Sequence, residues 1–268
     1  MPIPLLMSMV ASPKPPDHSR RTVPVRKRWG QHFLHDGNIV RKIIAALDIQ
    51  DDDRILEVGP GRGILTRMLA ETNARITAVE LDPLLAAELR KQDWPRVRIV
   101  EEDFLKYNLS EWESGYKMVG NLPYNITSPV IFKLLNHPGW TRAVIMIQLE
   151  VAQRITAIPE NRIYGRLSVM VQCLAKARIL FSVSPSVFTP PPKVDSAVVL
   201  LEPGERHFFN QEKLEHVVRK AFSQRRKTLR NALGDVLPPE LKDQFGGLRA
   251  EDLSPDDYIL ISTLATNT

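Results

Sequence analysis

Cysteine is nearly absent from this chain of 268 residues, because Cys173 is the single one. One cysteine excludes an internal disulfide and a metal site built on several cysteines. Cys173 lies in the apolar run 169–174, VMVQCL, which favours a buried side chain over a reactive thiol. A chain without disulfides fits a reducing compartment, so we expect a cytoplasmic location.

Long apolar runs are also missing. No run approaches the roughly 20 residues that a membrane-spanning helix needs. The first residues lack the order of basic cluster, apolar stretch and small-residue cleavage site that is typical of a secretion signal. We therefore expect neither a membrane partner nor secretion. With 43% hydrophobic and 25% charged residues, the chain is expected to form one large core and a small second domain.

Acidic residues are scarce in two segments. Residues 1–28 contain six basic residues and one acidic residue, and their net charge of +5 equals that of the whole chain. Residues 213–230 contain seven basic residues against Glu215. Such segments favour a polyanionic partner such as RNA, although a solvated tail and a solvated helix face fit the composition equally well. The candidates for RNA phosphate contacts are the cations of a basic helix, Arg225, Arg226, Lys227 and Arg230.

The chain divides into three parts. Residues 1–27 contain six prolines without periodicity, which predicts a basic flexible arm. Residues 28–204 alternate between strand and helix patterns, which predicts an α/β domain with a mostly parallel sheet covered on both faces. Residues 205–268 are expected to form a small all-helical domain that binds RNA.

The expected strands of the α/β domain end in an antiparallel pair at the sheet edge. They are 54–58, 75–80, 97–100, 117–119, 143–148, 177–183 and 195–201. The expected helices are 38–47, 64–70, 83–91, 149–157 and 166–174.

The first predicted strand ends in the glycine-rich junction 57–63, EVGPGRG. Glycines such as Gly59 let the backbone approach a ligand closely, and helix N-terminal amides favour anionic or polar groups. Glu80 ends the second strand, where a carboxylate can accept hydrogen bonds from ribose hydroxyls. Asp103 follows the third strand and can accept one from an adenine amino group. Both carboxylates also fit solvated strand ends.

Two classes of cofactor fit this junction. A nicotinamide oxidoreductase shares the glycine loop and the acidic strand end, so these features alone are weak. The spacing here is GxGxG rather than GxGxxG, and Glu57 precedes the first glycine by two residues. Both details resemble S-adenosylmethionine-dependent methyltransferases, in which no pyrophosphate must be bound.

The stretch 120–126, GNLPYNI, follows an apolar strand and precedes a predicted helix start. An adenine amine is a poor nucleophile because its lone pair is delocalised into the ring. The side-chain oxygen of Asn121 and the carbonyl of Leu122 can accept its two N–H groups and localise that pair. Pro123 stiffens the turn, and the ring of Tyr124 can stack on a base taken out of its helix. A turn that merely ends a strand is the alternative.

Three further stretches narrow the interpretation. They are 30–34 (GQHFL), 186–199 (SVFTPPPKVDSAVV) and 221–230 (AFSQRRKTLR). With the glycine loop and the Asn-Leu-Pro-Tyr turn, they resemble the ribosomal RNA adenine N6,N6-dimethyltransferase family, and within it the small-subunit branch of kasugamycin-sensitivity dimethyladenosine transferases. The resemblance covers roughly residues 28–264. It implies a Rossmann-like class I S-adenosylmethionine-dependent methyltransferase fold with a seven-stranded sheet.

The resemblance also implies a reaction and residue roles. Two methyl groups would pass from S-adenosylmethionine to each of two adjacent adenosines near the 3′ end of the small-subunit RNA during ribosome assembly. The implied cofactor contacts are His32, Leu34, Gly59, Glu80, Asp103 and Asn121. The residues implied to act at the target amine are Asn121, Leu122 and Tyr124. Tyr124 and Phe188 would stack on the two faces of the flipped adenine.

The implied site departs from the family pattern at one residue, and we expect it to hold no metal. Family members often have Asn in place of His32, so only the backbone contact carries over there. His35 is a near neighbour, but no third ligand is evident, so we expect no metal. The family also suggests a monomer that binds the 30S particle or its precursor.

Three other functions are compatible with parts of the pattern. The large-subunit branch of the same family confers macrolide resistance, but the segment 188–196 and the Arg-Arg-Lys tail favour the small-subunit branch. A non-catalytic RNA-binding assembly or transcription factor could keep the fold, yet Asn121, Pro123 and Tyr124 are all present. A nicotinamide oxidoreductase is the third alternative.

Overall fold

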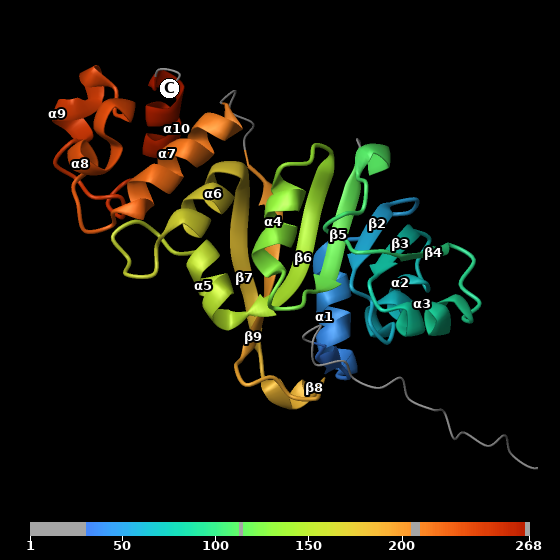
Figure 1. Ribbon diagram of the computed structural model, residues 1–268. Helices are drawn as coiled ribbons and strands as arrows, with labels where there is room; N and C mark the ends of the chain where they lie inside the picture. Colours follow the sequence, from blue (N-terminus) through green and yellow to red (C-terminus); the bar gives the residue numbers. More distant parts are fainter. Residues whose placement is uncertain (1–30, 113–114, 205–209, 266–268) are drawn as a thin grey trace, which may run out of the picture.

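The structure is a computed structural model that describes residues 31–112, 115–204 and 210–265. The predicted arm at residues 1–27 lies outside the described residues. Within them, strands and helices mostly alternate as far as α5, two strands of the main sheet follow α6, and the chain continues after the sheet with helices alone (Figure 1).

Seven strands form one sheet in the order β4-β3-β2-β5-β6-β9-β7 (Figure 1). Their bounds are β2 Arg54–Val58, β3 Arg75–Glu80, β4 Val97–Glu101, β5 Tyr116–Asn121, β6 Trp140–Gln148, β7 Ala175–Val183 and β9 Ser196–Pro203. Neighbours from β4 to β6 run parallel, whereas β9 is antiparallel to both β6 and β7. The predicted parallel sheet with an antiparallel edge pair is confirmed. β6 begins earlier than predicted because its pairing with β5 continues through the polar Arg142.

Ten α-helices are found in the described residues. Their bounds are α1 Gly37–Leu47, α2 Ile64–Leu69, α3 Pro83–Arg90, α4 Thr127–Leu135, α5 Leu149–Ile155, α6 Arg166–Leu174, α7 Gln211–Ser223, α8 Leu229–Leu233, α9 Lys242–Phe245 and α10 Pro255–Leu264. Aspartates start two of them. The Asp36 carboxylate accepts the N–H groups of Asn38 and Ile39 at the start of α1, and Asp82 accepts the Leu84 N–H at the start of α3.

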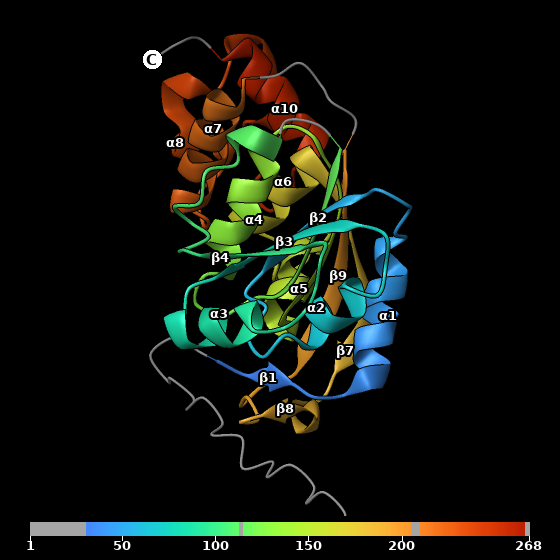
Figure 2. The ribbon, with the colours of Figure 1, turned by 90° about the vertical axis from the view of Figure 1, so that its right-hand side faces the viewer.

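Apolar side chains alternate between the two faces of the sheet. In β2, Ile55 packs in the cluster that contains residues of α1 and α2, whereas Leu56 and Val58 pack in the cluster that contains residues of α4, α5 and α6. Figure 2 shows α1 and α2 on one face and α4, α5 and α6 on the other. The central strands are therefore buried on both sides and almost continuously apolar. This layering is the predicted Rossmann-like α/β fold.

The helices after the sheet, α7 to α10, lie together beside α6 (Figure 1) and pack around a second apolar core. That core also contains Val169 and Met170 of α6 and Tyr164, which precedes α6. The Tyr164 hydroxyl donates to the Leu253 carbonyl at 3.0 Å. The C-terminal helices are thus anchored on α6, and the division of the chain at residue 204 stays a prediction.

Cys173 lies in this same core. It is buried, and its Sγ is 3.5 Å from the carbonyl of Pro255. Burial raises the pKa of the thiol to about 12, so little thiolate forms at neutral pH. The predicted burial of Cys173 is confirmed.

A second sheet of two short strands was not predicted. β1 Phe33–Leu34 pairs antiparallel with β8 Phe188–Thr189, with Leu34 opposite Phe188 (Figure 2). Strands of two residues carry no readable alternation, so the sequence pattern could not reveal them. The pair joins the segment before α1 to the Phe-Thr-Pro-Pro-Pro segment.

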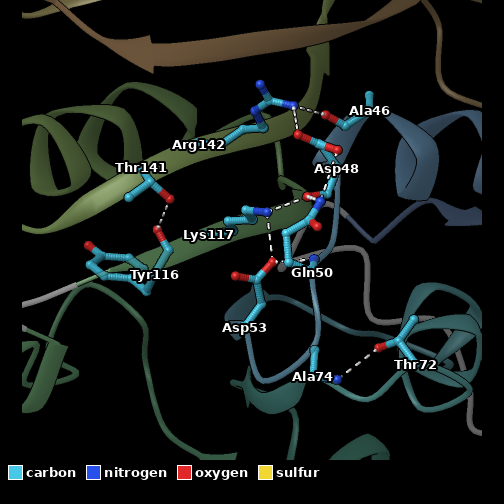
Figure 3. Close-up of polar contacts among 10 residues, drawn as sticks. All are labelled: Ala46, Asp48, Gln50, Asp53, Thr72, Ala74, Tyr116, Lys117, Thr141 and Arg142. Atoms are coloured by element: carbon cyan, nitrogen blue, oxygen red, sulfur yellow. Dashed lines mark hydrogen bonds and ion pairs between the residues drawn. The ribbon is translucent and has the colours of Figure 1, made fainter.

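A group of charged residues lies at the carboxyl end of α1 (Figure 3). Lys117 of β5 donates to the Asp48 carbonyl and, at 2.7 Å, to Asp53 Oδ2. Arg142 of β6 donates to the Ala46 carbonyl at 3.4 Å and lies 3.5 Å from the Asp48 carboxylate. Cations there interact favourably with the negative end of the helix dipole. We call Asp48, Asp53, Lys117 and Arg142 the α1-terminus cluster.

Candidate active site

One pocket lies at the carboxyl ends of four parallel strands. The strand order reverses between β2 and β5, and ligands bind at such reversals in open α/β sheets. The fold gathers most of the predicted site there from separate segments of the chain. The predicted residues that line the pocket are His32, Leu34, Gly59, Glu80, Asp103, Asn121, Leu122 and Tyr124.

The loop after β2 forms the floor of the pocket through its backbone. Gly59 has a φ of +68°, a left-handed conformation that glycine adopts without strain, and its N–H donates to the Val79 carbonyl at 3.0 Å. The N–H of Gly61 donates to Glu80 Oε2 at 2.9 Å. The loop is therefore tied to β3, and its glycines leave the backbone open to a ligand.

Glu80 lies at the end of β3 with only 6% of its surface exposed. Oε2 accepts the Gly61 N–H, and Oε1 accepts the Asp82 N–H at 2.8 Å. Burial raises the pKa of this carboxyl group, while the two backbone N–H groups oppose the rise. These hydrogen bonds hold the carboxylate in one orientation, and its oxygens retain lone pairs that can accept from a diol such as ribose.

Asp103 lies in the turn that follows β4. Its Oδ1 accepts the Leu105 N–H at 2.9 Å, and its carbonyl accepts the N–H groups of Lys106 and Tyr107. No hydrogen bond from a described residue to Oδ2 is recorded, so this oxygen can accept from an amino group in the pocket. The adjacent Phe104, which is 4% exposed, lines the same wall and can pack against a planar ring.

The Asn-Leu-Pro-Tyr turn begins where β5 passes close to β2. A Cβ atom on Gly120 would lie 2.5 Å from the Val58 carbonyl oxygen, so the close approach requires glycine. The Asn121 Nδ2 donates to the His32 carbonyl at 2.9 Å, which leaves its Oδ1 as an acceptor. The Leu122 N–H donates to the Met146 carbonyl at 3.0 Å. These contacts fix the peptide and the amide that were predicted to orient the target amine.

Tyr124 is held from two sides. Its hydroxyl lies 2.7 Å from Ser196 Oγ, and its ring stacks on that of His32 with centroids 5.7 Å apart and planes at 27°. His32 Nδ1 lies 2.8 Å from the Pro190 carbonyl, a contact in which the ring N–H donates. Burial raises the pKa of Tyr124, so its hydroxyl stays neutral. His32 thus contributes its carbonyl to Asn121 and its ring to Tyr124.

Phe188 does not line this pocket. It is 3% exposed and packs in the apolar cluster that includes Val40 and Ile43 of α1. Pairing of β8 with β1 places it opposite Leu34, with the ring in the core. Stacking on a base would require the ring to leave this packing. The predicted stacking role of Phe188 therefore stays a prediction, and the described packing does not support it.

Glu57 is a buried carboxylate whose behaviour the sequence motif did not reveal. It is 0% exposed, and neither of its oxygens has a hydrogen-bond partner among the described residues. Burial raises the pKa of Glu57 to about 8; the Glu80 charge adds to the rise, and the nearby Thr66 opposes it. The position of Glu57 inside a predicted apolar strand was the one sequence feature that could have indicated a buried carboxyl group.

Phe33 and Arg62 also line the pocket without having been predicted. The Arg62 guanidinium lies 4.5 Å from the centroid of the Phe33 ring, in a cation–π arrangement. A Cβ atom on Gly61 would lie 3.1 Å from the same ring, so the glycine loop and β1 pack closely together. The strand pairing that creates this contact is not readable from local sequence.

Three of the four predicted RNA contacts lie in a turn, and the fourth, Arg230, lies in the short helix α8, so they do not share one basic helix. α7 ends at Ser223, and Arg225, Arg226 and Lys227 follow it, because the turn must reverse the chain before α8. Arg225 Nε lies 2.6 Å from Glu251 Oε2, and an Arg225 Nη donates to the Arg162 carbonyl at 2.7 Å. Arg225 therefore ties this turn to the loop before α6. Arg226, Lys227 and Arg230 are exposed.

No group of three or more His, Cys, Asp or Glu side chains in the described part of the chain could hold a metal ion. None of the described helices has the length and apolarity required to cross a bilayer.

Two solved structures share this architecture. A dimethyladenosine transferase from Plasmodium falciparum superposes with a TM-score of 0.78 at 28% identity, covering 86% of this chain and 96% of that one. The 23S rRNA methyltransferase ErmE superposes with a TM-score of 0.71 at 28% identity, covering 86% and 98%. The strand order, the glycine loop and these neighbours define the chain as a class I S-adenosylmethionine-dependent methyltransferase, as predicted.

A family profile described as ribosomal RNA adenine dimethylase matches residues 23–266. The chain belongs to this family, and the predicted family and enzyme class are confirmed. A protein of Marinobacter nauticus called "Ribosomal RNA small subunit methyltransferase A" is 42% identical over 254 residues, which cover 91% of this chain and 92% of the relative. A protein of Coxiella burnetii with the same name is 40% identical over 257 residues, covering 91% and 99%. Membership of this family argues against the alternative interpretation of the chain as a nicotinamide oxidoreductase.

Proposed function

We propose that this chain transfers methyl groups from S-adenosylmethionine to N6 of two adjacent adenosines near the 3′ end of small-subunit ribosomal RNA during ribosome assembly. The observation that carries the proposal is the Asn121 amide. Its Nδ2 is bound to the His32 carbonyl, and its Oδ1 remains as an acceptor in the pocket that Tyr124, Glu80 and Asp103 also line. One cavity thus combines groups for a nucleoside cofactor with groups for a second base.

The donors and acceptors of the pocket fit S-adenosylmethionine. Glu80 presents an oriented carboxylate to the ribose hydroxyls, and Asp103 Oδ2 can accept from the adenine amino group. The Gly59 backbone lets the methionine portion pass close to the chain, bordered by His32 and Leu34. When bound, this cofactor supplies an electrophilic methyl group on a positively charged sulfur.

The turn after β5 would activate the target amine by hydrogen bonding. Asn121 Oδ1 and the Leu122 carbonyl accept the two N–H groups of the adenine amine, which favours a pyramidal nitrogen with a localised lone pair. No strong general base is needed beforehand, because the alkylated amine is acidic and loses its proton readily. The rate then depends mainly on holding the nitrogen in line with the methyl group.

Tyr124 would stack on the target adenine after the base leaves its helix. Its ring is fixed by the Ser196 hydroxyl at one end and supported by the His32 ring on one face. A ring that is already immobilised loses little conformational entropy when a base stacks on it. Phe188 would join the stack if β8 moves when RNA binds.

The RNA would be held outside the pocket by cations of the turn after α7 and of α8. Arg226, Lys227 and Arg230 are exposed and can bind phosphates, whereas Arg225 already pairs with Glu251. In this proposal residues 205–268 form the RNA-binding part and the enzyme acts as a cytoplasmic monomer on the 30S particle or its precursor. The small-subunit branch is supported by relatives of 40–42% identity that carry that name.

Methylation of isolated ribosomal particles tests the proposal. Purified 30S particles that lack the two modifications are incubated with the full chain and radiolabelled S-adenosylmethionine, alongside naked large-subunit RNA. We expect label in two adjacent adenosines of the small-subunit RNA and none in the large RNA. Label in the large RNA alone would favour the large-subunit branch. Binding to 30S without label would favour a non-catalytic assembly factor.

A further inference from the structure

Lys133 lies on α4, and its ammonium group is surrounded by backbone carbonyls of the loop that follows β4. Nζ is 2.8 Å from the Phe104 carbonyl oxygen, 2.9 Å from that of Leu105 and 2.6 Å from that of Tyr107. An ammonium group has three N–H donors and no acceptor. The three carbonyls therefore match its full donor capacity.

The same loop presents Asp103 to the pocket. The Asp103 carbonyl accepts the N–H of Lys106 at 2.8 Å and that of Tyr107 at 2.9 Å, and its Oδ1 accepts the Leu105 N–H at 2.9 Å. Asp103 thus begins a tight turn, and Lys133 contacts the backbone carbonyls of the residues that follow Asp103 in this turn. Without Lys133, those converging carbonyls would face a site without a donor, and the turn would lose its second anchor.

Lys133 also contacts the aromatic wall of the pocket. Its Nζ lies 5.2 Å from the centroid of the Phe104 ring, which is buried and lines the cavity. Partial burial lowers the pKa of Lys133, and the charges of Asp103 and Glu102 oppose that change. The ammonium group is thus electrostatically coupled to the carboxylate that faces the pocket.

Helix α4 connects this anchor to the Asn-Leu-Pro-Tyr turn. The helix starts directly after the turn, at Thr127, and its buried residues Val130, Ile131 and Leu134 pack on the sheet. Lys133 is therefore carried by a rigid element whose other end begins at the predicted methyl-transfer turn. One helix holds both the turn that orients the target base and the loop that reaches the cofactor adenine.

We propose that Lys133 is a positioning residue that fixes the loop 102–107, so that Asp103 recognises the amino group of the cofactor adenine. This inference rests on the proposed function, because it assigns Asp103 to the S-adenosylmethionine adenine. Lys133 does not touch the cofactor. It acts through the backbone of the loop, and its loss is expected to impair the discrimination between adenine and a purine without the amino group.

The test compares two ligands on the full chain by isothermal titration calorimetry. S-adenosylhomocysteine carries the amino group, and S-inosylhomocysteine carries an oxygen in its place. We expect the unmodified chain to bind the first at least tenfold more tightly, because a site whose acceptor is oriented toward an amino group rejects a ligand that lacks that donor. Lys133→Met should reduce this ratio at least fivefold, mainly through weaker binding of S-adenosylhomocysteine. Lys133→Arg should retain part of it, because guanidinium N–H groups can reach some of the carbonyls.

Lys91→Met is the matched control, because Lys91 is an exposed lysine that pairs with Glu88 on the surface of α3. It should leave the ratio unchanged. A ratio in Lys133→Met equal to that of the unmodified chain would overturn the positioning role, even if the melting temperature falls, because a merely structural loss weakens both ligands together. If Lys133→Met does not fold, Lys133→Gln answers the question: a reduced ratio supports the role and an unchanged ratio overturns it.

Ligand binding by the unmodified chain distinguishes a failure of this inference from a failure of the proposed function. Binding of neither ligand would contradict the proposed methyltransferase function. Equal binding of both ligands would overturn the assignment of Asp103 and, with it, the role of Lys133. Strong discrimination by the unmodified chain and by Lys133→Met would leave the function standing and overturn the role of Lys133.

Discussion

The two ends of the parallel sheet differ in whether their polar side chains are paired. At the amino ends of the strands, the α1-terminus cluster pairs Lys117 with Asp53 and places Arg142 beside Asp48 (Figure 3). At the carboxyl ends, Asp103 and Asn121 line the pocket, and each keeps a side-chain oxygen with no recorded hydrogen bond from a described residue. Satisfied groups stabilise the fold, whereas groups with remaining capacity can bind a ligand. The difference locates function at one end and stability at the other.

Asn121→Ala removes an acceptor at the pocket end and is expected to have the largest effect. Methyl transfer should slow by about 10²–10³-fold, because the rate depends on orienting the amine. Cofactor binding and RNA binding should survive in part. Single-turnover transfer of labelled methyl groups to under-methylated 30S particles measures the loss, with Asn73→Ala, an exposed asparagine at the opposite end of the sheet, as the control. Unchanged turnover would reject the assigned mechanism.

Lys117→Met applies the same kind of deletion at the other end. Its side chain is 12% exposed, and its loss leaves the Asp53 carboxylate, 22% exposed, without a counter-charge. The free energy of unfolding should fall by about 3 kcal/mol, while the folded enzyme keeps its rate of methyl transfer. Urea denaturation and activity at 25 °C check the two parts, with exposed Lys91→Met as the control. A slower rate at unchanged stability would erase the contrast between the two ends.

Glu57→Gln tests the buried carboxyl group through its pH dependence. Because burial raises the pKa of Glu57 to about 8 in the folded chain from its ordinary value of 4.5, the folded state retains a proton that the unfolded state releases between these values. This contribution to stability is full below pH 4.5 and is lost as the pH rises to about 8, by about 1.4 kcal/mol per pH unit. Glutamine should remove that slope. Urea denaturation from pH 5 to pH 8 measures it, and equal slopes in both proteins would show that Glu57 does not titrate in this way.

The double variant Arg226→Gln, Lys227→Gln tests two exposed cations that, unlike those of the α1-terminus cluster, form no recorded ion pair with another described residue. Affinity for 30S particles should fall about tenfold, and the slope of log affinity against log salt should flatten by roughly one unit for each lost phosphate contact. Binding measured over a series of KCl concentrations checks this. Arg90→Gln with Lys91→Gln is a charge-matched control on α3. If the slope does not change, Arg226 and Lys227 are ordinary surface charges.

Much of the fold could be predicted because its signals are local. The short apolar runs of β2 and β3 and the glycine loop at 57–63 can each be read within a few residues. The site residues Glu80, Asp103 and Asn121 could be chosen because each ends or follows a strand, and parallel strands bring their carboxyl ends to one edge. The strand pair β1–β8 could not be foreseen, because it joins residues 154 and 156 positions apart through very short segments.

The sequence by itself determined the order of strands and helices, the family, and the residues at the strand ends, because all of these are encoded by short-range pattern and by recognisable motifs. Only the tertiary structure decided which polar groups are satisfied. It buried Phe188 against α1, tied Arg225 to Glu251, left Glu57 without a hydrogen-bond partner in the described part of the chain and placed Lys133 against three carbonyls. Whether a group is paired depends on distant parts of the chain that packing brings together, and local sequence carries no record of them.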